Sequence, residues 1–225
     1  MTIALLPLAD MEMAVAGFRR VRSELDLIGA ILPANVLATR DEARKMSPLF
    51  EAAEDLGGHI FVHPGLRSDQ FPPPDLGGRP RFADSVLARM ALQVQSNLGH
   101  ATVTLTCTDF LEPYGRVTVQ VTNLGGTLPA VVERMDHAAK IRMPDSAMPL
   151  AGLGRVYVDC ALLGPRAIEA ASAAFGAERL LLGIDCLIFR TDLTIDAVAA
   201  ANIPKAECNA LLAGNAQALL TEYST

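Results

Sequence analysis

Short apolar runs alternate with amphipathic stretches along almost the whole chain, and this alternation restricts the fold more than any other feature. The predicted strands cover residues 3–8, 28–33, 59–63, 117–122, 156–160 and 180–184. The predicted helices cover residues 10–25, 47–56, 82–96, 128–140, 165–175, 195–201 and 205–220. Strands that alternate with helices predict an α/β fold with parallel pairing and right-handed crossovers. A doubly wound sheet and a (β/α) barrel both fit the six units, although no Gly-x-Gly-x-x-Gly follows the first strand to indicate dinucleotide binding.

Local signals set the expected ends of some elements. Asp10 and Ser47 are candidate N-caps, because their side-chain oxygens can accept a hydrogen bond from the first helical turn. Residues 101–108 are rich in Thr and Val, which on propensity alone favours a strand.

Composition excludes several classes of protein. A chain of 225 residues with 51% hydrophobic residues predicts a single domain over residues 1–225. The net charge of -6 and the lack of a basic run argue against nonspecific nucleic-acid binding. No apolar run approaches the roughly 20 residues that span a bilayer. The four cysteines form no Cys-x-x-Cys pair, so we expect reduced thiols and a cytoplasmic protein.

Two predicted strands end in residues that can bind a divalent metal. One apolar run ends at His63, followed by Pro64 and Gly65, and another leads to Asp185. In parallel α/β folds, the carboxyl ends of the strands are where functional residues gather. No His-x-His pair occurs in the chain to complete such a metal site.

Several segments together resemble a known family. They read SPLFEAAE at 47–54 with VHPG at 62–65, NLGG at 123–126 with ER at 133–134, VYVD at 156–159, FGAERLLLGIDC at 175–186, and GNA at 214–216. The combination resembles the amidohydrolase-related family, in the branch of carboxymuconate-semialdehyde and resorcylate decarboxylases. The resemblance implies a (β/α) TIM barrel whose third strand matches the first strand here, so that about six of eight strand–helix units are present. It also implies a helix over residues 97–111, against their propensity.

The resemblance implies a metal site and its residues. The family holds a divalent ion, zinc first and manganese second, through a His-x-His pair, a histidine that His63 matches and an aspartate that Asp185 matches. Asn123 stands where the family has a proton-transferring histidine, and an amide cannot shuttle a proton at neutral pH. We therefore expect His63 and Asp185 as metal ligands, Asn123 and Asp185 as catalytic residues, and Arg67 and Asn35 as substrate-binding residues.

Alternatives stay open at this point. Cys160 and Cys186 follow consecutive strands and could supply replacement thiolate ligands, or they are two small buried apolar residues. The function expected from the resemblance is metal-dependent hydrolysis or nonoxidative decarboxylation of a small carboxylated or aromatic acid. The alternative is a truncated or catalytically silent barrel homologue with a binding or assembly role. An open six-stranded sheet exposes two edges, which we expect to be covered by a partner copy in a homo-oligomer, by the chain's own termini or by a rearranged sheet.

Overall fold

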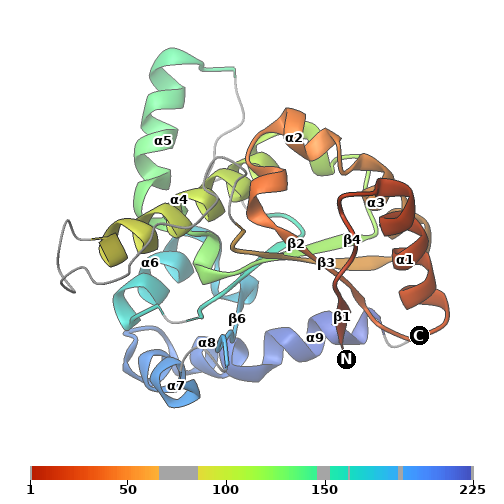
Figure 1. The fold of residues 1–225 in the computed structure, drawn as a ribbon. Coiled ribbons are helices and arrows are strands. Elements are labelled where there is room, and N and C mark those ends of the chain that lie inside the picture. The colour runs from red at the N-terminus through yellow and green to blue at the C-terminus, as the bar shows by residue number, and fades with distance from the viewer. Residues whose placement is uncertain (1, 66–85, 146–152, 162, 187–189, 224–225) are drawn as a thin grey trace.

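Six parallel strands form one sheet in the order β1-β2-β3-β4-β5-β6 (Figure 1). The computed structural model describes residues 2–65, 86–145, 153–161, 163–186 and 190–223. The strands are β1 (Ile3–Ala4), β2 (Gly29–Pro33), β3 (Gly58–His63), β4 (Val117–Val121), β5 (Val156–Asp159) and β6 (Leu180–Leu181). A doubly wound sheet reverses its strand order at a switch point. The sequential order found here is that of a barrel wall, and the six predicted units are confirmed.

Helices follow the strands along the chain. They are α1 (Met11–Ser23), α2 (Arg40–Arg44), α3 (Ser47–Leu56), α4 (Val86–Cys107), α5 (Leu128–Arg142), α6 (Pro165–Phe175), α7 (Thr191–Ala200), α8 (Lys205–Asn209) and α9 (Asn215–Thr221). A π-helical turn, η8 (Ala210–Gly214), joins α8 to α9, so the predicted helix over 205–220 is present with a bulge. Short 3-10 turns include η1 (Ala34–Leu37) after β2 and η5 (Asn123–Gly125) after β4.

The strand that propensity favours over residues 101–108 is wrong, because α4 continues to Cys107. Ala101 and Thr102 are fully buried there. The Thr102 hydroxyl donates to the carbonyl oxygen of Leu98, one turn earlier, at 2.9 Å, which satisfies a buried polar group inside the helix. Burial against the rest of the fold outweighs the weak local preference for a strand.

Of the two predicted helix caps, Asp10 is confirmed and Ser47 is wrong. The Asp10 carboxylate accepts a hydrogen bond from the backbone N–H of Met13 at 3.1 Å, which confirms it as the N-cap of α1. Ser47 is the first residue inside α3 rather than its cap, and the N-cap residue Met46 makes no side-chain hydrogen bond.

Strand β4 shows how the two faces of the sheet differ. Val117, Val119 and Val121 are fully buried in the core shared with the helices. The alternate residues Thr118 and Gln120 point to the opposite, concave face, because successive side chains of a strand alternate. The register pairs Thr118 with His59 of β3 and Gln120 with Phe61, so these side chains lie on the same concave face.

The C-terminal helix lies across the gap between the two edge strands. Ile3 of β1, Leu181 of β6 and Leu219 of α9 line one cavity of about 390 Å³ together. Figure 1 shows α9 running beside β1. This placement agrees with the expectation that the chain's own terminus covers the edges. Homo-oligomerisation stays a prediction.

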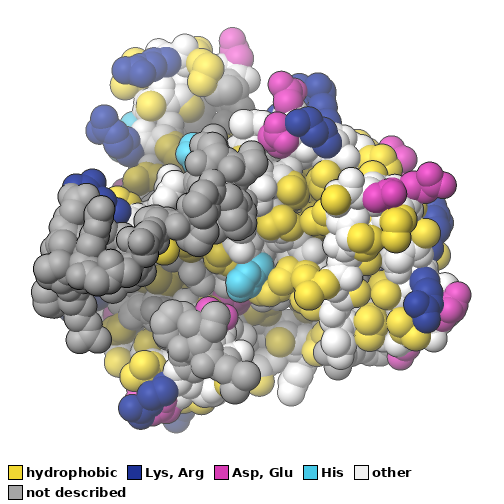
Figure 2. Space-filling view, viewed as in Figure 1, with side chains coloured by type: hydrophobic (Ala, Val, Ile, Leu, Met, Phe, Trp, Pro, Cys, Tyr) yellow, Lys and Arg dark blue, Asp and Glu magenta, His cyan; other side chains and the backbone are white. Residues whose placement is uncertain are grey.

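Surface charge and helix hydropathy can be described for part of the chain. On the face shown in Figure 2, Lys and Arg side chains are scattered among Asp and Glu, so that face has no broad basic patch. Among the described residues, no helix combines the length and the hydropathy needed to cross a bilayer. The cytoplasmic location stays a prediction.

Candidate functional site at the carboxyl end of the sheet

His63 and Asp185 meet at the carboxyl end of the sheet although they come from strands that do not pair. His63 is the last residue of β3, and Asp185 follows β6 by four residues. The His63 Nε2 and Asp185 Oδ1 atoms are 4.0 Å apart, and the two side chains are 37% and 31% exposed. This separation is too long for a hydrogen bond. Two ligand atoms bound to one tetrahedral zinc ion at typical distances lie roughly 3.4 Å apart, so the separation found here is only slightly longer. The sequence prediction that these residues share a site is consistent with this geometry.

Asn123 begins the turn that follows β4, the strand that neighbours β3. Both Asn123 and Leu124 have φ of 54°, in the left-handed region. The backbone N–H of Asn123 donates to Asp159 Oδ1 at 3.3 Å, and its side-chain Oδ1 accepts from the Thr122 hydroxyl at 3.1 Å. The Asn123 side chain is therefore contacted by Thr122 at the carboxyl end of the sheet, and its amide group can offer a hydrogen bond but no proton transfer.

Of the two expected substrate-binding residues, the structure describes Asn35 but not Arg67. Asn35 lies in η1, just after β2, and its buried Oδ1 atom has no hydrogen-bond partner among the residues that the structure describes. A methyl group added at Gly65, two residues after His63, would lie 2.7 Å from that oxygen, so Asn35 packs against the segment that follows β3. A buried acceptor without a partner is rare in folded proteins, which makes it a candidate acceptor for a ligand group. Arg67 lies outside the described residues, and its role stays a prediction.

Asp159, the last residue of β5, was not among the predicted site residues. Its side chain is almost fully buried, with the residue 1% exposed. Oδ1 accepts from the Thr122 hydroxyl at 3.0 Å, the Ala161 N–H at 3.1 Å and the Asn123 N–H, while Oδ2 accepts from the Gln120 amide at 2.7 Å. Burial raises the pKa of this carboxyl, and the four donors oppose that rise. The alternation of Thr118 and Gln120 in β4 with Thr122 directly after it was the sequence signal for a polar concave face that would need such an acceptor.

The cysteine alternatives are resolved in part. Cys160 is fully buried, and burial raises the pKa of its thiol to about 11, which disfavours the thiolate that binds metals. Cys186 is exposed, so the interpretation as two buried apolar residues is wrong for it. All four cysteines are free thiols, as predicted.

The metal site is incomplete in the part of the chain that the structure describes. No group of three or more His, Cys, Asp or Glu side chains lies together there in a way that could hold an ion. His63 and Asp185 thus supply two ligands, whereas a catalytic zinc site usually has three protein ligands and an open position. Neither cysteine completes the set.

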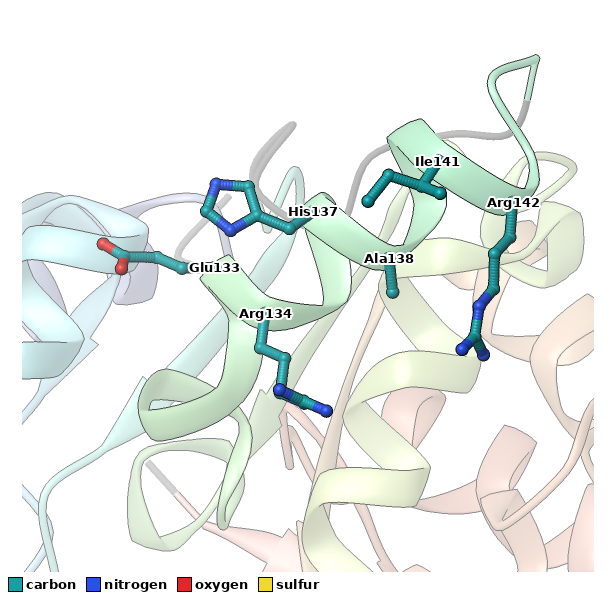
Figure 3. A pocket seen from close by; sticks show the side chains of 6 residues that line it. All are labelled: Glu133, Arg134, His137, Ala138, Ile141 and Arg142. Carbon is teal, nitrogen blue, oxygen red and sulfur yellow. The ribbon is translucent and has the colours of Figure 1, made fainter.

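Two other hollows are lined by described residues away from His63 and Asp185. One lies along α5, and the described residues that line it all come from that helix: Glu133, Arg134, His137, Ala138, Ile141 and Arg142 (Figure 3). Figure 3 shows Arg134 and Arg142 pointing away from the side on which Glu133 and His137 lie, so the lining groups do not converge. The cavity beneath α9 contains His59, whose ring Nδ1 lies 2.8 Å from the Thr118 hydroxyl oxygen. That histidine is only 3% exposed, which fits a structural role.

The comparisons with known proteins agree with the fold. The curated 2-amino-3-carboxymuconate-6-semialdehyde decarboxylase of Dictyostelium discoideum is 25% identical over 197 residues, which are 80% of this chain. The 2,6-dihydroxybenzoate decarboxylase from Rhizobium has a similar structure, with a TM-score of 0.73, 18% identity, and coverage of 97% of this chain and 70% of that one. A dihydroxybenzoic acid decarboxylase from Polaromonas sp. JS666, with bound manganese and the inhibitor 2-nitroresorcinol, gives a TM-score of 0.74 at 20% identity, covering 99% of this chain and 69% of that one.

The family follows from the extent of the sequence match. The chain spans about half, 49%, of the length of its curated relative from Dictyostelium. The structural similarities, at 18% and 20% identity, concern the fold. The amidohydrolase family model, however, matches residues 3–221. Since this match includes β1, β6 and every strand between them, the chain belongs to the amidohydrolase family.

Proposed function

We propose that the protein is a carboxy-lyase that removes CO₂ from a small aromatic carboxylic acid at the mouth formed by His63, Asn123 and Asp185. The observation that carries the proposal is the approach of His63 Nε2 to within 4.0 Å of Asp185 Oδ1, from strands β3 and β6. The relatives with similar sequence or structure are named as decarboxylases of such acids or of a carboxymuconate semialdehyde. Hydrolysis at the same kind of scaffold is the runner-up, since fold alone does not choose the reaction.

The chemistry sets the roles of the residues. In decarboxylation the bond between the carboxylate and the ring carbon breaks, its electron pair stays on that carbon, and a proton must reach the same atom as CO₂ leaves. Asn123 cannot deliver that proton, because an amide does not titrate near neutral pH. Asp185 is the carboxyl group that we assign to the transfer of that proton, because its side chain lies beside His63 at the same end of the sheet. The Oδ1 atom of Asn35, which has no partner within the described part of the chain, would accept a hydrogen bond from a ring hydroxyl of the substrate.

We further propose that a divalent metal, manganese or zinc, is bound in part by His63 and Asp185. When bound, such an ion would polarise a substrate oxygen. The described residues provide only two ligands, so at least one more must come from the rest of the protein or from the substrate. Metal binding is therefore tested separately from turnover.

The test measures both properties on the same preparation. The protein is purified without a polyhistidine tag, titrated with Mn²⁺ and Zn²⁺ by calorimetry, and assayed for CO₂ release from 2,6-dihydroxybenzoate and related hydroxybenzoates. The His63→Ala and Asp185→Asn variants are compared with His137→Ala, because His137 is exposed on α5 and outside the mouth. We expect the metal affinity and the rate of CO₂ release to fall at least tenfold in His63→Ala and Asp185→Asn, as for the removal of one catalytic group, and to stay unchanged in His137→Ala.

A noncatalytic role is the second candidate. It is favoured by the amide at Asn123 and by the two-ligand set at the mouth. If the wild type takes up no metal and releases no CO₂ from any hydroxybenzoate, the carboxy-lyase proposal fails. Binding of the same acids without turnover would then support the noncatalytic role.

A further inference from the structure

The concave face holds a buried carboxylate that the proposed reaction does not use. Asp159 is 1% exposed, and both of its oxygens are occupied by donors, three on Oδ1 and one on Oδ2. A group enclosed in this way does not contact a substrate. Its four hydrogen bonds must therefore serve the protein itself, since burying a carboxylate is costly unless its hydrogen bonds are satisfied.

The first set of contacts holds the turn that carries Asn123. Asn123 and Leu124 both adopt left-handed backbone angles, which are unfavourable for residues with a Cβ. Such a conformation persists only when the surrounding structure holds it. Asp159 Oδ1 accepts from the Asn123 N–H at 3.3 Å and from the neighbouring Thr122 hydroxyl at 3.0 Å, so the carboxylate fixes the start of this turn.

The second contact lies on the other side of the carboxylate. A methyl group added at Gly183 would lie 2.3 Å from Asp159 Oδ1, so the chain that leaves β6 runs directly against this oxygen. Asp185 follows two residues later and has φ of 45°, again in the left-handed region. The carboxylate therefore separates the segment that carries Asn123 from the segment that carries Asp185.

We propose that Asp159 is a positioning residue that sets the placement of Asn123 and Asp185 at the mouth, through the Asn123 N–H on one side and through Gly183 on the other. The inference concerns the site of the proposed carboxy-lyase and rests on that function for its consequences in turnover. The placement itself is a property of the folded chain and can be measured without substrate or metal.

The central variant is Asp159→Ala, with two matched partners. Asp159→Asn keeps the shape and one acceptor oxygen for the Asn123 N–H, while the Gln120 amide can turn its own oxygen toward the new NH₂ group. Thr118→Val removes another buried polar group from the concave face of β4, at the end away from the mouth. It therefore controls for a general loss of stability.

The first readout is amide hydrogen exchange at Asn123 together with the NMR shifts of the His63 ring and the Asn123 side-chain amide. We expect Asp159→Ala to speed exchange at Asn123 by about tenfold or more, the loss expected for one charge-assisted hydrogen bond. The ring and amide resonances should shift as well. Asp159→Asn should restore exchange to within a few-fold of wild type, and Thr118→Val should leave the mouth resonances in place.

A double-mutant cycle tests the second contact. Gly183→Ala should lower the melting temperature in the wild-type background, because the added methyl group meets the carboxylate. In the Asp159→Ala background the same change should lower it by less, because the Oδ1 and Cγ atoms at 2.3 and 2.6 Å are then gone and only the Cβ atom at 2.9 Å remains. Equal losses in the two backgrounds would contradict the contact.

The outcomes separate this inference from the proposed function. If Asp159→Ala leaves exchange at Asn123 and the His63 resonances unchanged, the positioning role is overturned, whatever the activity. If the resonances move as expected while the wild type binds no metal and releases no CO₂, the positioning role stands and the carboxy-lyase proposal fails.

Discussion

The clearest consequence of the buried concave face is a loss of stability in mild acid caused by His59. Burial lowers the pKa of this histidine from 6.5 to about 4, and the Gln120 side chain opposes the shift only in part. Between these two pH values the unfolded chain binds a proton that the folded chain does not. Stability contributed by the neutral ring is therefore complete above pH 6.5 and is lost as the pH falls toward 4.

The magnitude follows from the shift. A difference of roughly 2.5 pH units at about 1.4 kcal/mol per unit gives a loss of about 3 kcal/mol in the free energy of unfolding between pH 6.5 and 4. Asp159 acts in the opposite direction, because burial raises its pKa and acid then protonates the folded state first. The informative quantity is therefore the difference between the wild type and a variant that lacks the ring.

The assay is urea unfolding at half-unit steps from pH 4 to 7.5 for the wild type, His59→Gln and His137→Gln. Glutamine can still hydrogen-bond the Thr118 hydroxyl, while the exposed His137 on α5 serves as the control for removing any histidine. We expect the stability difference between wild type and His59→Gln to change by about 3 kcal/mol over this range. A difference that stays constant with pH would refute the burial argument.

Three further predictions concern backbone, capping and thiols. Gly126→Ala should destabilise the fold by about 3 kcal/mol or more, because φ is 72° there and the new Cβ would lie 2.0 Å from a backbone oxygen of α4. The control variant Gly115→Ala, whose new Cβ would make only ordinary contacts, should change the stability in urea by roughly 0.5 kcal/mol or less. Asp10→Ala should cost about 1 kcal/mol in thermal or urea unfolding through loss of the α1 cap. In native protein the exposed Cys186 should react with a thiol reagent, whereas the buried Cys160, with a pKa of about 11, should react only on unfolding; equal rates would contradict this assignment.

Local sequence patterns predicted the helices and strands well where residues close in the sequence determine them. The boundaries of α6 and the N-cap of α1 follow from nearby residues, and the structure confirms both. Local propensity failed for residues 101–108, where burial of Ala101 and Thr102 keeps α4 helical. The edge strands β1 and β6 are shorter than predicted, because each pairs on one side only.

The sequence alone therefore determined the α/β class, the six units and the candidates His63 and Asp185, since these depend on periodicity and on residues at strand ends. Only the tertiary structure showed the sequential strand order, the 4.0 Å approach of those two side chains and the burial of Asp159. The carboxylate of Asp159 contacts residues 36 or more positions earlier and lies against a segment more than 20 residues later. Such contacts arise from the curvature that brings separate strand ends together, and no pattern within one segment contains that information.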